Sequence, residues 1–160
     1  MYKRQILIAT YNPGKLREIK AILKGIPYQL ITLEDIQFDE EIPESGRSFK
    51  ENAILKARII GQRTHLVTLA EDSGLEVDVL DGRPGIYSAR YAKGTDLDRI
   101  NKLLEELKAI PKEKRKARFR SVVAIYDPTK EEVKTFQGAS DGYITDKPVG
   151  NNGFGYDPIF

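Results

Sequence analysis

Short apolar runs alternate with segments of helical periodicity along the first third of the chain. After the apolar run at residues 6–9, large apolar residues recur at positions 16, 19, 22 and 23, a spacing of three and four that predicts an amphipathic helix. Gly25 and Pro27 are expected to end this helix, and residues 28–33 are predicted to form a second strand. The acidic segment 34–46 is predicted to be a loop.

A second helix is predicted to begin at Ser48-Phe49-Lys50-Glu51, because this serine-to-glutamate spacing is that of a capping box. Its apolar positions continue to residue 60, and Gly61 is expected to end it. The apolar run at residues 66–70 is then a strand. The polar residues Glu71-Asp72-Ser73-Gly74 are predicted to form a tight turn, with a further extended segment at residues 75–80.

A third helix and a hairpin are predicted in the second half of the chain. Thr95-Asp96-Leu97-Asp98 has the spacing of a helix cap, apolar residues at 100, 103, 104 and 107 share one face, and Pro111 stops the helix. Residues 118–126 and 132–137 are predicted strands joined by the turn at 127–130. The mixture predicts a single α/β domain over residues 1–160, built on a mixed sheet flanked by helices.

Composition narrows the chemistry of any metal site. The chain of 160 residues has no cysteine and a single histidine, His65, which excludes disulfides, thiolate sites and a histidine-based zinc cluster. A bound metal should therefore have oxygen ligands. No apolar run approaches the roughly 20 residues of a membrane helix, and the start, Met1-Tyr2-Lys3-Arg4-Gln5, leads into a strand rather than a signal peptide. A cytoplasmic protein without membrane contact is expected.

The basic residues are concentrated at residues 112–120, although the net charge is only +2. Most charge runs of this kind are solvated connectors, which is the favoured interpretation here. A nucleic-acid-binding patch is the alternative.

Three polar segments offer candidate site residues. Thr10, Asn12 and Lys15 lie where the first strand gives way to a helix, and the amino end of a helix can bind phosphate. The segment is not a Walker A loop, because it lacks the leading glycine of that motif and Leu16 follows the lysine in place of serine or threonine. The alternative is an ordinary turn in which Asn12 caps the helix and Lys15 is solvated.

Glu44 and Asp72 are candidates for binding Mg²⁺, which prefers carboxylate oxygens, water and substrate phosphates. Asp72 could also take the proton of an attacking water. The alternatives are a turn carboxylate at Asp72 and one more surface charge at Glu44. Glu51 is assigned to the capping box instead.

Two further segments could contact a nucleotide. Asn52 and Lys56 share a helix face, so Lys56 could neutralise a phosphate, although an exposed lysine is the commoner outcome. In the loop Gly153-Phe154-Gly155-Tyr156-Asp157, the glycines allow close backbone approach, the aromatics offer a stacking surface and Asp157 could accept from a base. The alternative is a turn whose aromatics belong to the core. His65 is expected in a turn.

Taken together, the motifs resemble the inosine triphosphate pyrophosphatase family, the non-standard purine nucleoside triphosphate pyrophosphatases. The matching segments are Ala9-Thr10-x-Asn12-x-x-Lys15-x-x-Glu18-Ile19, Ser48-Phe49-x-Glu51-Asn52-Ala53-x-x-Lys56-Ala57, Glu71-Asp72-Ser73-Gly74-Leu75, Pro84-Gly85-Ile86-Tyr87-Ser88-Ala89-Arg90-Tyr91 and Gly153-Phe154-Gly155-Tyr156-Asp157-Pro158-Ile159-Phe160. Because several long motifs occur in fixed order over essentially the whole chain, the resemblance is specific.

The resemblance implies Mg²⁺-dependent hydrolysis of dITP, ITP or XTP to the monophosphate and pyrophosphate, by a homodimer. It implies an elongated α/β domain with a central mixed sheet and two lobes around a substrate cleft. The implied roles are as follows: triphosphate binding by Thr10, Asn12, Lys15 and Lys56; metal binding by Glu44 and Asp72; proton acceptance by Asp72; substrate contact by Ser73; and purine binding by Phe154, Gly155, Tyr156 and Asp157.

Members of that family continue past the segment matching Phe160 with a strand, a lysine and a Ser-His-Arg motif that help to recognise the 6-oxo purine. This sequence has none of them, so we expect a C-terminally truncated form or a natural short form with impaired selectivity. Three rival functions stay open: a pyrophosphatase for other modified nucleotides, a nucleic-acid-binding module built on residues 112–120, and a fragment that binds nucleotide without turnover.

Overall fold

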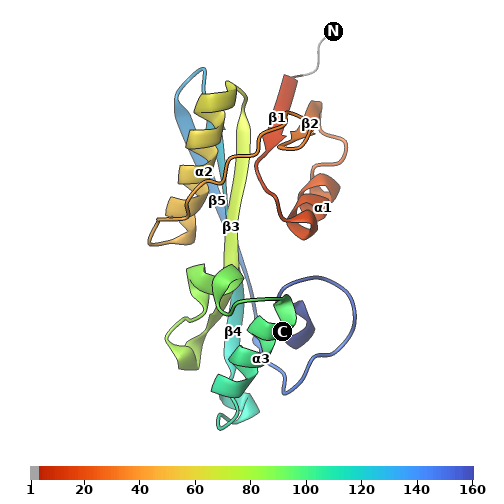
Figure 1. The fold of residues 1–160 in the computed structure, drawn as a ribbon, viewed down its shortest axis with the longest axis vertical. Coiled ribbons are helices and arrows are strands. Elements are labelled where there is room, and N and C mark those ends of the chain that lie inside the picture. The colour runs from red at the N-terminus through yellow and green to blue at the C-terminus, as the bar shows by residue number, and fades with distance from the viewer. Residues whose placement is uncertain (1–3) are drawn as a thin grey trace. The chain divides into compact units, whose positions relative to one another are not determined.

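In the part of the chain that the structure describes, five strands form one sheet in the order β2-β1-β3-β4-β5 (Figure 1). The computed structural model describes residues 4–160, so Met1-Tyr2-Lys3, part of the segment expected to lead into a strand, lies outside the described residues. The strands are β1 (Arg4–Ile8), β2 (Tyr28–Thr32), β3 (Thr68–Val77), β4 (Lys116–Asp127) and β5 (Glu132–Tyr143). β1 pairs in parallel with both β2 and β3. β4 and β5 are neighbours joined by a short turn, which makes them an antiparallel hairpin.

Within residues 4–160, three α-helices and four short 3₁₀ helices accompany the sheet. They are α1 (Pro13–Ile22), α2 (Phe49–Thr64), α3 (Asp96–Glu106), η1 (Asp78–Leu80), η2 (Gly85–Arg90), η3 (Lys112–Lys114) and η4 (Asp157–Ile159). The prediction of a mixed sheet flanked by helices is confirmed. No helix within residues 4–160 has the length and apolar character needed to cross a membrane.

The described chain divides into two compact units. The first unit contains the residues up to Asp72 and the segment Val122–Gln137, and the second contains Ser73–Ser121 and Gly138–Phe160. The expectation of one domain over residues 1–160 stays a prediction. The sections below describe each unit by itself.

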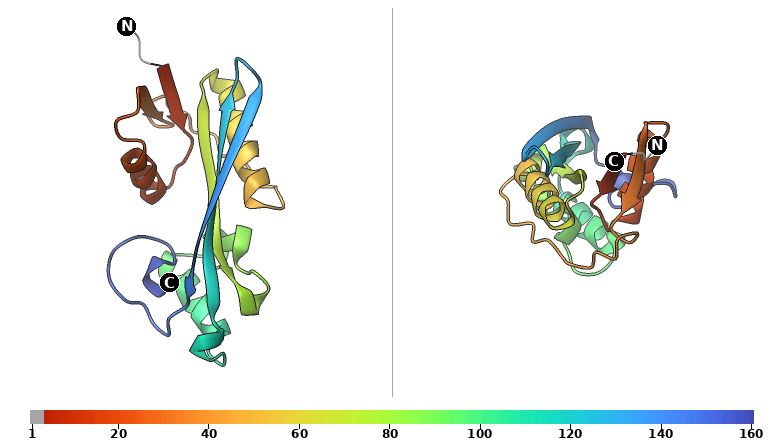
Figure 2. Two further views of the ribbon diagram at one scale, coloured as in Figure 1. Left: turned by 180° about the vertical axis from the view of Figure 1, so that it is seen from behind. Right: turned by 90° about the horizontal axis from the view of Figure 1, so that it is seen from above.

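In the first unit, α2 lies along β3 and the β4–β5 hairpin in all three views (Figures 1 and 2). The prediction that Gly61 ends this helix is wrong, because α2 continues to Thr64 and ends at His65, whose φ of 56° is left-handed. Gly61 instead allows close packing: a Cβ there would lie 2.5 Å from the ring of Tyr126. The expectation of a turn at His65 is confirmed.

β3 runs without a break through Glu71-Asp72-Ser73-Gly74, so the predicted tight turn and the separate extended segment after it are wrong. Strand-forming residues flank this polar stretch on both sides, and its carboxylates are buried and paired rather than solvated. Successive side chains of a strand point to opposite faces. Glu71 and Asp72 therefore meet different helices.

The second unit has its own core around α3. The predicted cap is confirmed in full: the Thr95 hydroxyl accepts from Asp98 N, and the Asp98 carboxylate accepts from Thr95 N. The buried cluster beneath the helix comprises Leu75, Val77, Leu80, Ile100, Leu103, Leu107, Ala117, Ile144, Tyr156 and Ile159. The last part of the chain is thus built into the interior of this unit.

Candidate functional site

Parallel pairing of β1 with β3 brings the first candidate loop beside Glu71. Leu7 and Ile8 pair with Thr68 and Leu69, so the chain leaving β1 runs along the next residues of β3. The ammonium of Lys15, in the first turn of α1, lies 2.7 Å from the Glu71 carboxylate. Carboxyl ends of parallel strands are where open α/β sheets bind ligands, and this edge holds both signs of charge.

The loop between β1 and α1 is held by its own side chains. Asn12 caps α1, with its amide oxygen accepting from Lys15 N at 3.1 Å, and the Thr10 hydroxyl accepts from Asn12 N at 3.1 Å. The capping alternative is therefore realised for Asn12. Lys15 is not solvated as that alternative expected, because it is paired with Glu71. The Lys15 ammonium, in the first turn of α1, is therefore already paired with a carboxylate.

Asp72 faces α2 and is almost fully buried, with 5% of the residue exposed. Its Oδ2 accepts from the amide nitrogen of Asn52 at 2.9 Å, and its Oδ1 lies 3.9 Å from the ammonium of Lys56. Burial raises the pKa of Asp72 above its ordinary value, while the Lys56 ammonium and the Asn52 hydrogen bond act in the opposite direction. The prediction that Asn52 and Lys56 share a face is confirmed, and that face meets Asp72.

Glu44 reaches the same cluster from the loop before α2. Its Oε1 accepts from Lys56 Nζ at 2.8 Å, so one ammonium lies between the carboxylates of Glu44 and Asp72. Lys56 is only 14% exposed and is not the surface lysine of the alternative interpretation. The capping box predicted for Glu51 is only half formed: Ser48 accepts from Glu51 N, but the Glu51 carboxylate accepts from Arg47 N and not from Ser48 N.

The oxygen donors of this cluster fit a divalent metal of the Mg²⁺ type. Across residues 4–160, no group of three or more aspartates, glutamates or histidines is arranged as a complete protein-only metal site. Mg²⁺ does not need one, since it is commonly bound through one or two carboxylates with waters and substrate phosphates. Glu44 and Asp72, which share one ammonium, supply that number of carboxylates.

The loop before η4 belongs to the second unit and is fixed by two aspartates. The Asp157 carboxylate accepts from Phe154 N, and the Asp96 carboxylate of α3 accepts from Gly155 N, both at 2.8 Å. Gly153 has a φ of 82°, and a Cβ there would collide with the Asp157 carboxylate. Phe154 is partly exposed. The backbone N–H groups of Phe154 and Gly155 and the Asp157 carboxylate therefore stabilise the conformation of the loop.

The side chain of Tyr156 is in the core, which corrects its assignment to a stacking surface. It is 4% exposed and its hydroxyl donates to the carbonyl of Ser88 at 2.9 Å. Packing against the apolar cluster of the second unit, rather than ligand binding, explains the aromatic residue at this position. Ser73 also lies in the second unit, as a partly exposed residue of β3.

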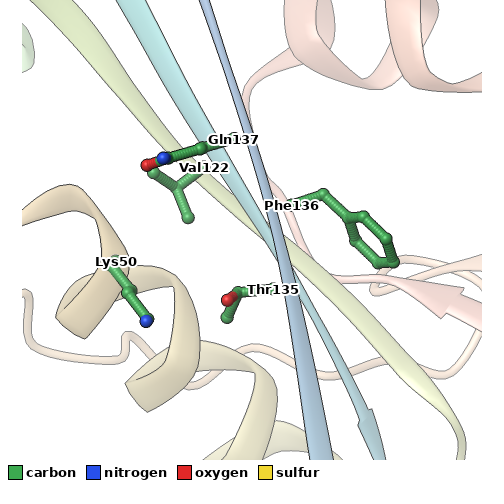
Figure 3. A pocket seen from close by; sticks show the side chains of 5 residues that line it. All are labelled: Lys50, Val122, Thr135, Phe136 and Gln137. Atoms are coloured by element: carbon green, nitrogen blue, oxygen red, sulfur yellow. The ribbon is translucent and has the colours of Figure 1, made fainter.

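A separate hollow of about 150 Å³ lies in the first unit between α2 and the hairpin, lined by Lys50, Val122, Thr135, Phe136 and Gln137. Figure 3 shows Lys50 and Thr135 facing this hollow, whereas Phe136 projects to the other side of β5. None of the candidate residues lines it. The hollow is therefore distinct from the cluster around Asp72.

The basic run at residues 112–120 is largely paired within the second unit. Arg115 is buried, and its guanidinium donates to the carbonyl of Ile110 and pairs with Asp146. Lys112, Arg118 and Arg120 also pair with carboxylates. The three lysines of the run are exposed and the three arginines are paired with carboxylates, so both interpretations of the run stay predictions.

Two residues that the sequence analysis did not assign to a site stand out. Asn52 is fully buried and bonded to Asp72, and Asp96 holds the backbone of the loop at Gly155. The available signal for Asn52 was its position one turn before Lys56 on the same helix face. Asp96 carried no such signal, because a helix cap explains an aspartate there.

Comparisons with known proteins agree with the motifs. The Ham1 family model matches residues 6–160. The dITP/XTP pyrophosphatases of Bacillus licheniformis and Bacillus subtilis are each 50% identical over 159 residues, covering 98% of this chain and 81% and 80% of those proteins. A HAM1 protein from Coxiella burnetii matches with a TM-score of 0.87 at 39% identity, covering 98% of this chain and 81% of that one. The Staphylococcus aureus Ham1 protein matches with a TM-score of 0.85 at 42% identity, covering 98% and 80%. These findings confirm the resemblance, and the chain belongs to the Ham1 family.

Proposed function

We propose that this chain hydrolyses non-standard purine nucleoside triphosphates, such as dITP and XTP, to the monophosphate and pyrophosphate. Relatives that share half of its residues are named for that activity. The observation that carries the proposal is the cluster in the first unit, in which the Lys15 and Lys56 ammonium groups contact the carboxylates of Glu71, Glu44 and Asp72. This arrangement suits a polyanion and a divalent cation together.

The triphosphate would be bound by the polar groups at the start of α1 and by Lys56. Lys15 and Lys56 are each paired with a carboxylate, and each keeps some exposure, 21% and 14%. Phosphate oxygens can replace those carboxylate partners without leaving a buried cation unpaired. Thr10 and Asn12 would add a hydroxyl and an amide at the positive end of the helix.

Glu44 and Asp72 would hold Mg²⁺. When bound, Mg²⁺ neutralises phosphate oxygens and makes a coordinated water easier to deprotonate. Asp72 would also accept the proton of the water that attacks the α-phosphorus, after which the bond to the β-phosphate breaks and pyrophosphate leaves. Burial favours this role, because a carboxylate with a raised pKa is a stronger base.

For Ser73 and the loop before η4, the proposal is contact with the sugar and base, as the family resemblance implies. Phe154 is the aromatic available for stacking on the purine, and Gly155 and Asp157 would contribute backbone and carboxylate contacts. Tyr156 would support the loop from the core rather than touch the base. A homodimer working on the cytoplasmic nucleotide pool completes the proposal.

The test is pyrophosphate release from dITP, XTP and ATP in the presence of Mg²⁺. Hydrolysis of dITP and XTP well above that of ATP is expected. Asp72→Asn should lower turnover by about 100-fold or more, the scale for losing a general base, with nucleotide binding roughly retained. Asp81→Asn is the matched control, because Asp81 is exposed in a left-handed conformation that asparagine also tolerates.

The same assay separates the rival functions. Preferential turnover of other modified triphosphates would identify a different pyrophosphatase, and nucleotide binding without pyrophosphate release would identify a form without turnover. Steeply salt-dependent binding of DNA or RNA, with no hydrolysis, would favour a nucleic-acid-binding module. Equal turnover by Asp72→Asn and the unmodified protein would remove Asp72 from the role of base.

A further inference from the structure

Asn52 is a buried polar side chain between two segments that carry candidate metal-binding carboxylates. It lies in the first turn of α2 and is 0% exposed. On one side of it is β3 with Asp72, and on the other is the loop with Glu44 and Gly46. A fully buried amide is costly unless both of its ends are hydrogen-bonded.

Both ends of the Asn52 amide are used. Its nitrogen donates to Asp72 Oδ2 at 2.9 Å, and its oxygen accepts from Gly46 N at 2.8 Å. The reverse orientation of the amide would place an oxygen against the Asp72 carboxylate and an N–H group against the Gly46 N–H. The contacts therefore define which way the amide points.

Gly46 approaches this amide more closely than any other residue type could. A Cβ at position 46 would lie 2.6 Å from Asn52 Oδ1 and 2.9 Å from Asn52 N. The φ of Gly46 is not among the positive values, so the glycine is required here by space and not by backbone conformation. The loop that carries Glu44 is thus held against α2 through Asn52.

We propose that Asn52 is a positioning residue that fixes the Asp72 carboxylate and the Glu44 loop relative to each other for binding of a divalent metal. The inference rests on the proposed function only in taking Glu44 and Asp72 as the metal-binding pair. The hydrogen bond from Asn52 engages Oδ2 of Asp72 and leaves Oδ1 on the side of Lys56, whose ammonium also contacts Glu44. Groups that orient metal ligands in this way typically change metal affinity or activity by about 10-fold to 100-fold when they are removed.

The test compares Asn52→Leu with Thr68→Val in the full chain. Leucine has the same branching and number of side-chain heavy atoms and removes both hydrogen bonds of Asn52. Thr68 is the matched control, because it is also 0% exposed in the first unit and its hydroxyl bonds only to the carbonyl of Leu66 among the contacts described for it. Mn²⁺ serves as the probe, with its affinity measured by electron paramagnetic resonance without substrate, alongside the Mg²⁺ dependence of dITP hydrolysis.

Asn52→Leu should weaken Mn²⁺ binding and raise the half-saturating Mg²⁺ concentration by about 10-fold to 100-fold. The KM for dITP should rise much less, because the described side-chain hydrogen bonds of Asn52 go to Asp72 and Gly46 and not to Lys15 or Lys56. Thr68→Val should leave Mn²⁺ affinity unchanged even if it lowers the melting temperature. Gly46→Ala displaces the same amide from the loop side and should weaken Mn²⁺ binding too, so it decides the matter if Asn52→Leu does not fold.

Unchanged Mn²⁺ affinity in a folded Asn52→Leu protein, or an equal loss in Thr68→Val, would overturn the inference. A different result would refute the proposed function. An unmodified protein that binds Mn²⁺ but releases no pyrophosphate refutes the proposed function, while the ratio of Mn²⁺ affinities still decides the role of Asn52. An unmodified protein that binds no Mn²⁺ overturns the role of Asn52 as well.

Discussion

Replacing Gly61 with alanine should destabilise the protein, although alanine is the better helix former. Gly61 lies inside α2 and is buried against β4. In an unobstructed helix interior, glycine to alanine would stabilise by about 1 kcal/mol. Here the new methyl carbon would lie 2.5 Å from Tyr126 Cδ1 and 3.1 Å from the Thr68 hydroxyl.

Ordinary contacts between carbon atoms are about 3.5 to 4.0 Å, so the methyl group overlaps the Tyr126 ring by about 1 Å. Tyr126 is 2% exposed and has little room to move aside. Overpacking of this kind costs about 1 to 3 kcal/mol, and here the methyl group also lies against Thr68, so the upper end of that range is expected to outweigh the gain in helix propensity. A net loss of about 1 to 2 kcal/mol corresponds to a melting temperature lower by about 2 to 8 °C for a chain of this size.

The assay measures the stability of Gly61→Ala by urea denaturation and thermal melting. The control is the same substitution in a Tyr126→Leu background. Leucine removes the ring atoms that the methyl group meets, so alanine should cost less there, as a double-mutant cycle reports. A higher melting temperature for Gly61→Ala alone would refute the packing argument. It would mean that α2 lies further from the hairpin than described.

Three further outcomes are expected. Ser48→Ala removes the cap of α2 and should cost about 1 kcal/mol in urea denaturation. Tyr156→Phe loses the bond to the Ser88 carbonyl and should cost about 1 kcal/mol without changing the ratio of dITP to ATP turnover, since the ring is buried. Hydrogen bonds from Thr95, first from its backbone N–H and then from its hydroxyl, lower the pKa of Asp98, so its stabilising contribution is present above the unfolded pKa and is lost as pH falls through the lower folded pKa. Denaturation across acidic pH should show a shallower pH dependence in Asp98→Asn.

The sequence predicted the helix starts well, because a helix cap is formed by residues only three positions apart. The reciprocal bonds at Thr95 and Asp98 form where the spacing of a capping box stands in the sequence, and Ser48 caps α2 for the same reason. The capping box predicted at Ser48 is only half formed. The Glu51 carboxylate accepts from Arg47 N, one residue before the cap, and not from Ser48 N. β5 extends six residues past the predicted end at Gln137.

The errors come from residues whose surroundings are supplied by distant parts of the chain. Glu71 and Asp72 look like turn residues until helices elsewhere in the sequence provide Lys15 and Asn52 as partners. Gly61 looks like a helix end until the Tyr126 ring occupies the space of its missing side chain. Sequence spacing does not show such contacts. The unbroken β3 strand and the hydrogen bonds of Asn52 to Asp72 and Gly46 could therefore be found only in the folded structure.

The segment that leads into α2 and its first turn are held by three hydrogen bonds from backbone N–H groups to the side chains of Ser48, Glu51 and Asn52. Opening of a helix end can cost less free energy than unfolding of the whole protein. If catalysis needs Glu44 in place, mild heating should switch the enzyme off while most of the fold persists. Cooling should then restore activity promptly, because the first turn of α2 would have opened reversibly while the rest of the protein stayed folded.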